Sequence, residues 1–72
     1  MNTIDLQIGK RLRELRITAG ITQIELSRRL GWMPTKIINA ELGIIRMRVR
    51  DLSDLARALE VDIKDFYKGL HI

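Results

Sequence analysis

Residues 22–43, with the sequence TQIELSRRLGWMPTKIINAELG, constrain the fold more than any other part of the chain. They have the pattern of two short helices joined by a tight turn. Thr22 can cap the first helix through its hydroxyl, and Glu25, three residues later, can complete a capping box. Gly31 then supplies a residue suited to the turn. The segment therefore predicts a helix-turn-helix.

The second helix of this pair has clear signals at both ends. Pro34 suits a first helical position because its φ is already fixed near the helical value. Leu42 is the expected last residue, because Gly43 is placed to end the helix. A helix pair of this kind can direct its second helix into the major groove of DNA.

Apolar residues at three- and four-residue spacing predict further helices on both sides of the pair. We expect a first helix from about Asp5 to Ala19 and a fourth from about Val49 to Leu59. Asp62 is placed to cap a short final helix. The expected inward positions are Ile8, Leu12, Leu15 and Ala19 in the first helix, Val49, Leu52, Leu55, Ala56 and Leu59 in the fourth, and Ile63, Phe66 and Leu70 at the end.

The chain resembles the phage-repressor and Cro group of regulators, the XRE family, over nearly its whole length. IGKRLRELR is similar to the family's first helix, and VRDLSDLARALEVDIKDFY is similar to its fourth and fifth. The resemblance implies an all-α, compact five-helix lambda-repressor-like DNA-binding domain, with residues 1–72 as a single domain. It also implies a sequence-specific transcriptional regulator, by default a repressor that controls its own gene from a partly palindromic operator.

Size and composition limit the other classes of protein. A chain of 72 residues is near the lower limit for one unaided core. There is no cysteine, which excludes disulfides and thiolate metal sites and suits a reducing compartment. Since neither a leader sequence nor a run of about 18 apolar residues is present, we expect a soluble, cytoplasmic, nucleoid-associated protein without membrane contact.

Charge is unevenly distributed along the chain. Residues 1–50 hold ten Lys or Arg and four Asp or Glu, a net charge of +6, whereas residues 51–72 have a net charge of −2. A basic portion that contains the helix pair suits double-stranded DNA as the partner, with the acidic portion facing away. The alternative is ordinary solvated charge.

The resemblance assigns base contacts to the start of the second helix of the pair and to one turn later. These positions are Pro34, Thr35, Lys36 and Asn39. Asn39 is the strongest candidate, because its amide can donate to and accept from adenine at once. The alternatives are a solvated Asn39 and a phosphate contact by Lys36. Met33 and Pro34 stand where polar residues are common, and Ile38 lies on an outward side, which weakens the case for base readout by hydrogen bonds and leaves contacts with thymine methyls and DNA shape as contributions.

Phosphate contacts are expected from two places. The resemblance assigns one to Thr22 and Gln23, where the positive end of a helix assists. The other is the basic loop, in which Arg46 and Arg48 are the first candidates and Arg50 follows. Capping is the alternative role for Thr22, and solubility is the alternative for the arginines.

Two further positions are expected to serve the scaffold. The resemblance pairs Arg16 with Glu41 as an internal salt bridge between the first helix and the end of the third. Trp32 stands where an aliphatic core residue is usual, so core packing is its first interpretation. A role for Trp32 at a partner or groove surface is the alternative.

The C-terminal region and the loop hold more apolar residues than a small core needs. A two-fold homodimer would bury some of them and would space two recognition helices by about 34 to 36 Å. The alternative is that they cover the core of a monomer. The residues concerned are Ile44, Ile45, Met47 and Ile72, with Ile63, Phe66, Tyr67 and Leu70 as the candidates for the dimer interface.

Catalysis has little support in this sequence. His71 is the single histidine, no glycine-rich phosphate loop is present, and the paired aspartates at helix starts are explained by capping. We therefore expect neither an enzyme, nor a metal site, nor a cofactor. The main alternative to a regulator is an antitoxin-like or adaptor module, in which the same fold binds a protein partner.

Overall fold

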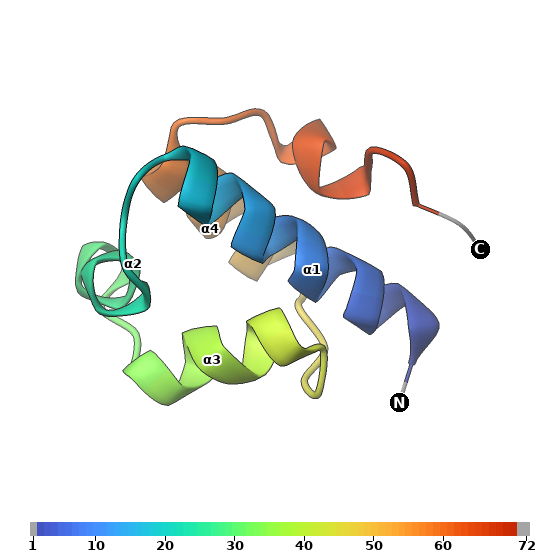
Figure 1. Cartoon of the computed structure of the whole chain (residues 1–72), viewed down its shortest axis with the longest axis horizontal. Coiled ribbons are helices and arrows are strands. Elements are labelled where there is room, and N and C mark those ends of the chain that lie inside the picture. The colour runs from blue at the N-terminus through green and yellow to red at the C-terminus, as the bar shows by residue number, and fades with distance from the viewer. Residues whose placement is uncertain (1, 71–72) are drawn as a thin grey trace.

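The computed structural model describes residues 2–70, which form four α-helices, a short 3₁₀ helix and no strand (Figure 1). In Figure 1, α1 crosses the middle of the molecule, α3 lies below it, and the 3₁₀ helix η1 lies on its opposite side. The elements are α1 (Thr3–Thr18), α2 (Gln23–Leu30), α3 (Pro34–Leu42), α4 (Val49–Leu59) and η1 (Ile63–Tyr67).

Both ends of the chain differ from the sequence-based expectation. The short final helix capped by Asp62 is present, but a fifth α-helix is not confirmed, because η1 is a single 3₁₀ segment in which Asp65 N donates to the Asp62 carbonyl at 2.9 Å. The segment ends at Tyr67, because Lys68 adopts an extended conformation with φ of −63° and ψ of 128°. At the other end, α1 begins two residues before the expected start, because the Asn2 side chain accepts from Ile4 N at 2.8 Å.

The capping box that opens the helix pair is confirmed. Glu25 N donates to Thr22 Oγ1 at 3.0 Å, and Thr22 N donates to Glu25 Oε1 at 3.1 Å. Gly31 and Gly43 both have φ near +70° and close α2 and α3 in the left-handed conformation that favours glycine. The boundaries of the helix pair are therefore encoded locally in the sequence.

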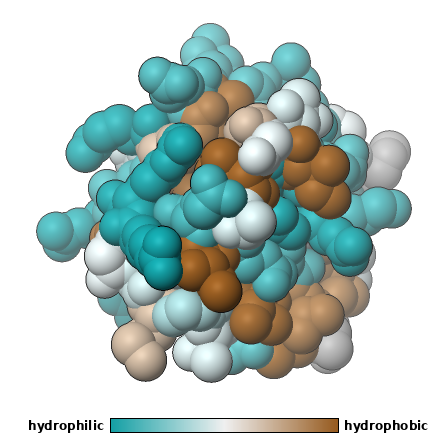
Figure 2. All heavy atoms as spheres, turned by 60° about the vertical axis from the view of Figure 1, so that its left-hand side comes forward, coloured by the Kyte–Doolittle hydropathy of each residue, from teal (hydrophilic) through white to brown (hydrophobic). Residues whose placement is uncertain are grey.

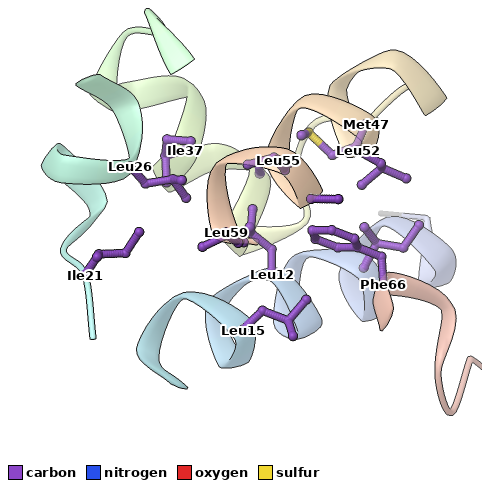
Figure 3. Packing of buried hydrophobic residues seen from close by; sticks show 13 residues of the cluster. Leu12, Leu15, Ile21, Leu26, Ile37, Met47, Leu52, Leu55, Leu59 and Phe66 are labelled. Atoms are coloured by element: carbon purple, nitrogen blue, oxygen red, sulfur yellow. The ribbon is translucent and has the colours of Figure 1, made fainter. Parts of the chain in front are cut away.

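One core holds the helices together (Figure 3). Leu12, Leu26, Ile37 and Leu55 are fully buried and come from α1, α2, α3 and α4, respectively. Two expected core positions were wrong. Ala19 is exposed because it lies one residue beyond the end of α1, and Val49 is 69% exposed because it is the first residue of α4 and faces solvent.

α1 and α3 approach each other unusually closely at Gly9. The Gly9 Cα faces the carbonyl oxygens of Ala40 and Glu41, and an added Cβ would lie 2.8 Å from the Glu41 oxygen and closer still to that of Ala40. A second close approach brings Gly43 against the backbone of Leu6. These two contacts set the distance between α1 and the C-terminal end of α3.

Within residues 2–70, no helix combines the length and apolarity needed to cross a bilayer. The same residues contain no cluster of His, Asp or Glu that could hold a metal ion. His71 and Ile72, both considered from the sequence, lie outside the described residues.

Candidate nucleic-acid interface

The two faces of α3 differ sharply. Ile37 and Ala40 are buried, and they hold the helix against α1 and α2. The opposite face carries four residues at helical spacing, namely Thr35, Ile38, Asn39 and Leu42. Ile38 is 38% exposed and Leu42 is 57% exposed, so this outer face is half polar and half apolar.

Thr35 and Asn39 carry the polar side-chain groups of the outer face of α3. Thr35 is exposed and Asn39 is half-buried, and neither side chain has a hydrogen-bond partner elsewhere in residues 2–70. Pro34 is half-buried at the first position of α3 and contributes no backbone donor. Of the four predicted base-contact residues, Thr35 and Asn39 are therefore the two with available polar groups.

Lys36, the fourth predicted base-contact residue, forms contacts with other residues of the protein. Its ammonium lies 3.8 Å from the centroid of the Trp32 ring and 3.4 Å from Asp51 Oδ1 on α4. The Lys36 side chain remains 39% exposed. Trp32 is half-buried and packs against the edge of the core, so it also supports the Lys36 side chain.

The start of α2 presents only part of the expected phosphate site. The Thr22 hydroxyl is occupied by the capping box. Gln23 Nε2 donates to Glu41 Oε1 at 3.1 Å, which ties this amide to the end of α3. Thr22 is nonetheless exposed, so the first turn of α2 remains accessible to an anion.

The segment 43–50, here called the arginine loop, runs from the end of α3 into the first two residues of α4 and carries the exposed residues Arg46, Arg48 and Arg50. Arg46 lies 3.8 Å from Asp5 of α1 and its side chain is 71% exposed. Arg48 and Arg50 are exposed and form no ion pair with any other described residue. The loop backbone is anchored where Arg48 N donates to Asp51 Oδ2 at 3.1 Å.

Arg16 and Glu41 form the ion pair that the resemblance implies. Arg16 Nε donates to Glu41 Oε2 at 2.6 Å, and Arg16 Nη2 donates to Glu41 Oε1 at 3.1 Å. The two side chains are only 12% and 4% exposed. Because Gln23 donates to the same carboxylate, Glu41 joins the C-terminal part of α1, the start of α2 and the end of α3.

The four candidates for a dimer interface occupy different environments. Phe66 is 1% exposed and packs in the core of this chain, so it offers no surface to a partner. Ile63 and Leu70 are half-buried against the core, and Tyr67 is 41% exposed. Arg11 Nε holds η1 in place by donating to the Asp65 carbonyl at 2.7 Å.

Hydrogen bonds lower two carboxyl pKa values at the caps. The pKa of Glu25 is lowered by its hydrogen bonds with the Thr22 backbone and hydroxyl, which favour the ionised carboxylate. The Lys68 ammonium, 3.0 Å from Asp65, lowers the pKa of that carboxyl in the same direction. Both groups support local structure rather than chemistry.

Three residues of this region were missed by the sequence reasoning. The sequence pattern predicts Leu42 only as the end of a helix, although its place seven residues after Thr35 puts it on the same face. Asp51 was taken only as a capping residue, and its contact with Lys36 had no local signal. Gly9 lies in a helix interior, where glycine is unfavourable. Its presence there was the one sequence signal for the close approach of α1 to α3.

Hydrophilic side chains cover most of the surface on the α2 side of the molecule, with several separate apolar patches between them (Figure 2). An outward-facing helix that follows a tight turn, flanked by a cationic loop, defines a helix-turn-helix DNA-binding domain. Residues 7–65 match the family described as the helix-turn-helix domain, so the chain belongs to this family, and it is of the XRE type.

Two known proteins illustrate the relationship. The chain is 34% identical over 67 residues to a protein of Rhodospirillum rubrum described as an uncharacterized transcriptional regulator in the ATPase CF(0) region. That match covers 93% of this chain and 62% of the relative, so the chain spans about three fifths of the relative's length. The crystal structure of the restriction-modification controller protein C.AhdI from Aeromonas hydrophila is similar with a TM-score of 0.82 and 27% identity, over 86% of this chain and 94% of that one.

Proposed function

We propose that this protein is a sequence-specific DNA-binding transcriptional regulator that places α3 in the major groove. The observation that carries the proposal is the outer face of α3, where Thr35 and Asn39 have polar groups without a partner in the described chain. Asn39 is placed to pair with the edge of an adenine, and Thr35 with a base or a phosphate. The names of the Rhodospirillum rubrum and Aeromonas hydrophila proteins support regulation as the role.

The arginine loop supplies the contacts that do not depend on sequence. Arg46, Arg48 and Arg50 are exposed in the segment that follows α3, and the first turn of α2 adds the positive end of a helix. Phosphate contacts from these two places would hold the domain on both sides of the groove. Gln23 contributes through its hold on Glu41 more than through its own contact with DNA.

The apolar half of the outer face fits the same role. Ile38 and Leu42 are placed to pack on thymine methyl groups, which distinguish A·T from G·C pairs without hydrogen bonds. The operator should then include T-rich steps beside the adenine contacted by Asn39. DNA shape would supply part of the preference, since few polar groups are available.

We further propose that the protein acts as a homodimer on a partly palindromic operator and represses transcription, including that of its own gene. The surface around Tyr67, with the half-buried Ile63 and Leu70, is the candidate interface. A two-fold arrangement would place the two α3 helices in successive major grooves, about 34 Å apart. Light scattering at micromolar concentration with and without operator tests this part, and a monomer in both cases would contradict it.

A protein-binding adaptor or antitoxin-like module is the second candidate. The observation in its favour is the exposure of three apolar side chains at or next to α3, since Met33 at its N-cap is 71% exposed and Ile38 and Leu42 are exposed on its outer face. Such a set of apolar side chains suits a protein partner as well as thymine methyls. DNA selection separates the two candidates.

The experiment that tests the proposed function is selection of duplex DNA from a random pool at about 150 mM salt, followed by a salt titration on the recovered sequence. The proposal expects a two-fold motif and nanomolar binding that weakens steeply with salt. The Asn39→Ala variant should lose the preference at one base pair in each half-site. Recovery of no motif from the wild-type protein would contradict the regulator and favour the adaptor.

A further inference from the structure

Lys36 and Asp51 connect the first turn of α3 to the first turn of α4, which follows the arginine loop. The backbone of α3 lies close to the backbones of α1 and α2, whereas its close approaches to α4 are few at most. Lys36 lies in the first turn of α3, and Asp51 lies in the first turn of α4, immediately after the arginine loop. Their ion pair, 3.4 Å between Nζ and Oδ1, spans this gap.

The Asp51 carboxylate uses both of its oxygens in this link. Oδ1 faces the Lys36 ammonium, and Oδ2 accepts the hydrogen bond of Arg48 N at 3.1 Å. The Asp51 side chain is 22% exposed, so water competes only partly for these contacts. One carboxylate therefore joins the first turn of α3 to the backbone of the arginine loop.

Trp32 holds Lys36 from the other side. The ammonium lies 3.8 Å from the ring centroid, and Trp32 is itself fixed by packing against the core and by its backbone N–H, which donates to the Ser27 carbonyl at 3.0 Å. The ammonium thus lies between an aromatic face and a carboxylate, each of which favours a cation there. A DNA phosphate would have to displace it from both.

We infer that Lys36 and Asp51 are positioning residues, whose bridge fixes the arginine loop relative to α3 so that phosphate and base contacts fall in register on DNA. This inference rests on the proposed DNA-binding function. In the complex, Lys36 remains on Asp51 and Trp32 and does not contact a base. The bridge therefore acts on specificity through the relative placement of α3 and the arginine loop.

Replacement of Asp51 by Asn is a test in which overall electrostatics and the positioning role predict opposite changes in operator affinity. The change removes a negative charge close to a polyanion, so electrostatics alone would strengthen binding to any DNA. Asn keeps an oxygen that can accept from Arg48 N, but it loses the charge that holds Lys36. The positioning role expects D51N to bind the selected operator about 3- to 10-fold more weakly, with binding to random duplex unchanged or stronger.

Asp54→Asn is the matched control. Asp54 lies on the same helix, one turn further along, and forms no ion pair within residues 2–70. D54N removes the same charge without breaking the bridge, and it should leave the ratio of operator to random-duplex affinity unchanged. The ratio is the right measurement because a loss of folded protein lowers both affinities equally. Thermal melting of each variant then checks that it is folded at the assay temperature.

Lys36 variants test the other end of the bridge. K36M keeps an apolar stem over Trp32 but removes the charge, and it should lower the specificity ratio as D51N does while leaving the salt dependence of operator binding unchanged. The double variant with both D51N and K36M should have a specificity ratio no lower than that of either single variant, because both changes break the same bridge. K36R should restore most of the ratio, since a guanidinium can reach Asp51 and stack on Trp32.

Three results would overturn the inference. The first is a D51N variant whose ratio of operator to random-duplex affinity equals that of D54N, or which binds the operator more tightly than the wild type. The second is a K36R variant that fails to restore the ratio lost in K36M. The third is a K36M variant in which the slope of log operator affinity against log salt falls by about one, which would place Lys36 on a phosphate. If the wild-type protein selects no DNA motif, the proposed function fails first, and the inference fails with it before any variant is compared.

Discussion

Gly9 of α1 lies directly against the backbone carbonyl of Ala40 in α3, with no space for a side chain between the two helices. Ala40 is 1% exposed and occupies the inward face of the helix that carries the candidate base contacts. The position of α3 relative to α1 therefore depends on the absence of a single Cβ.

Gly9→Ala tests this dependence. Alanine normally stabilises a helix interior relative to glycine, but here the added methyl group must displace the backbone of α3. We expect destabilisation by about 1 to 3 kcal/mol in urea unfolding. Gly20→Ala is the control, because Gly20 has a φ of +73° and open space around it, so its cost comes from the left-handed backbone alone, about 1 kcal/mol. A Gly9→Ala variant more stable than wild type would refute the close approach.

The Glu41 carboxylate should be important for stability rather than for DNA contact. Glu41→Gln removes the charge that faces Arg16 at 2.6 Å in a site where both side chains are almost fully buried. Leaving Arg16 without its partner should cost about 3 kcal/mol, measured by denaturant unfolding. Glu14→Gln is the matched control, since the Glu14 side chain is 55% exposed and its pair with Arg11 is 3.8 Å long, and it should change stability by under about 0.5 kcal/mol. Equal effects of the two changes would contradict the scaffold role.

Asn39→Ala should relax specificity at one base pair while leaving the fold intact. The Asn39 side chain has no hydrogen-bond partner within residues 2–70, so truncation leaves no protein group unsatisfied. We expect a loss of about 1 to 3 kcal/mol of discrimination at the adenine position. Binding to a panel of single-base operator variants measures this, with Thr18→Ala at the exposed end of α1 as the control. A uniform loss across the whole panel would argue against a direct base contact.

The arginine loop should determine the salt dependence of binding. Arg48→Gln should weaken binding to all sequences and lower the slope of log affinity against log salt by about one, because one phosphate contact is lost. Arg46→Gln should have a similar effect, diminished by its existing pair with Asp5. Arg57→Gln, at the exposed end of α4, is the control for a change of charge alone. An unchanged slope in Arg48→Gln would remove Arg48 from the interface.

The α2 capping box should make stability depend on pH in the acid range. The pKa of Glu25 is lower in the folded protein than its ordinary value near 4.5, so its contribution is complete above that pH and is lost as pH falls through the lowered value. Glu25→Gln should flatten this part of the curve of stability against pH. Thr22→Ser keeps the hydroxyl that bonds Glu25 and should retain the dependence. Identical curves for wild type and Glu25→Gln would show that the box does not contribute.

The helix pair was predictable because its signals are local. Thr22 with Glu25, Pro34 and the two left-handed glycines Gly31 and Gly43 each fix a boundary through their own backbone or side-chain chemistry. The end of the chain was less predictable, because the choice between an α-helix and a 3₁₀ segment after Asp62 depends on packing of Phe66 and on the hold of Arg11 on η1.

The candidate site was predictable in outline but not in its connections. Helical spacing placed Thr35 and Asn39 near one another, whereas the link from Lys36 to Asp51 joins residues fifteen apart through tertiary structure. For the same reason the hydrogen bond of Gln23 with Glu41 was not predictable, since it forms only when α2 and α3 are packed.

The division of α3 into two faces has a consequence for how such a protein can diverge. Ile37, Ala40 and Glu41 keep the helix in place from the inside, while Thr35, Ile38 and Asn39 face outward. On the proposed function, exchange of the outward residues gives a new target sequence without loss of fold. Duplicated copies of this gene would then acquire separate sets of promoters through a few substitutions on one helix.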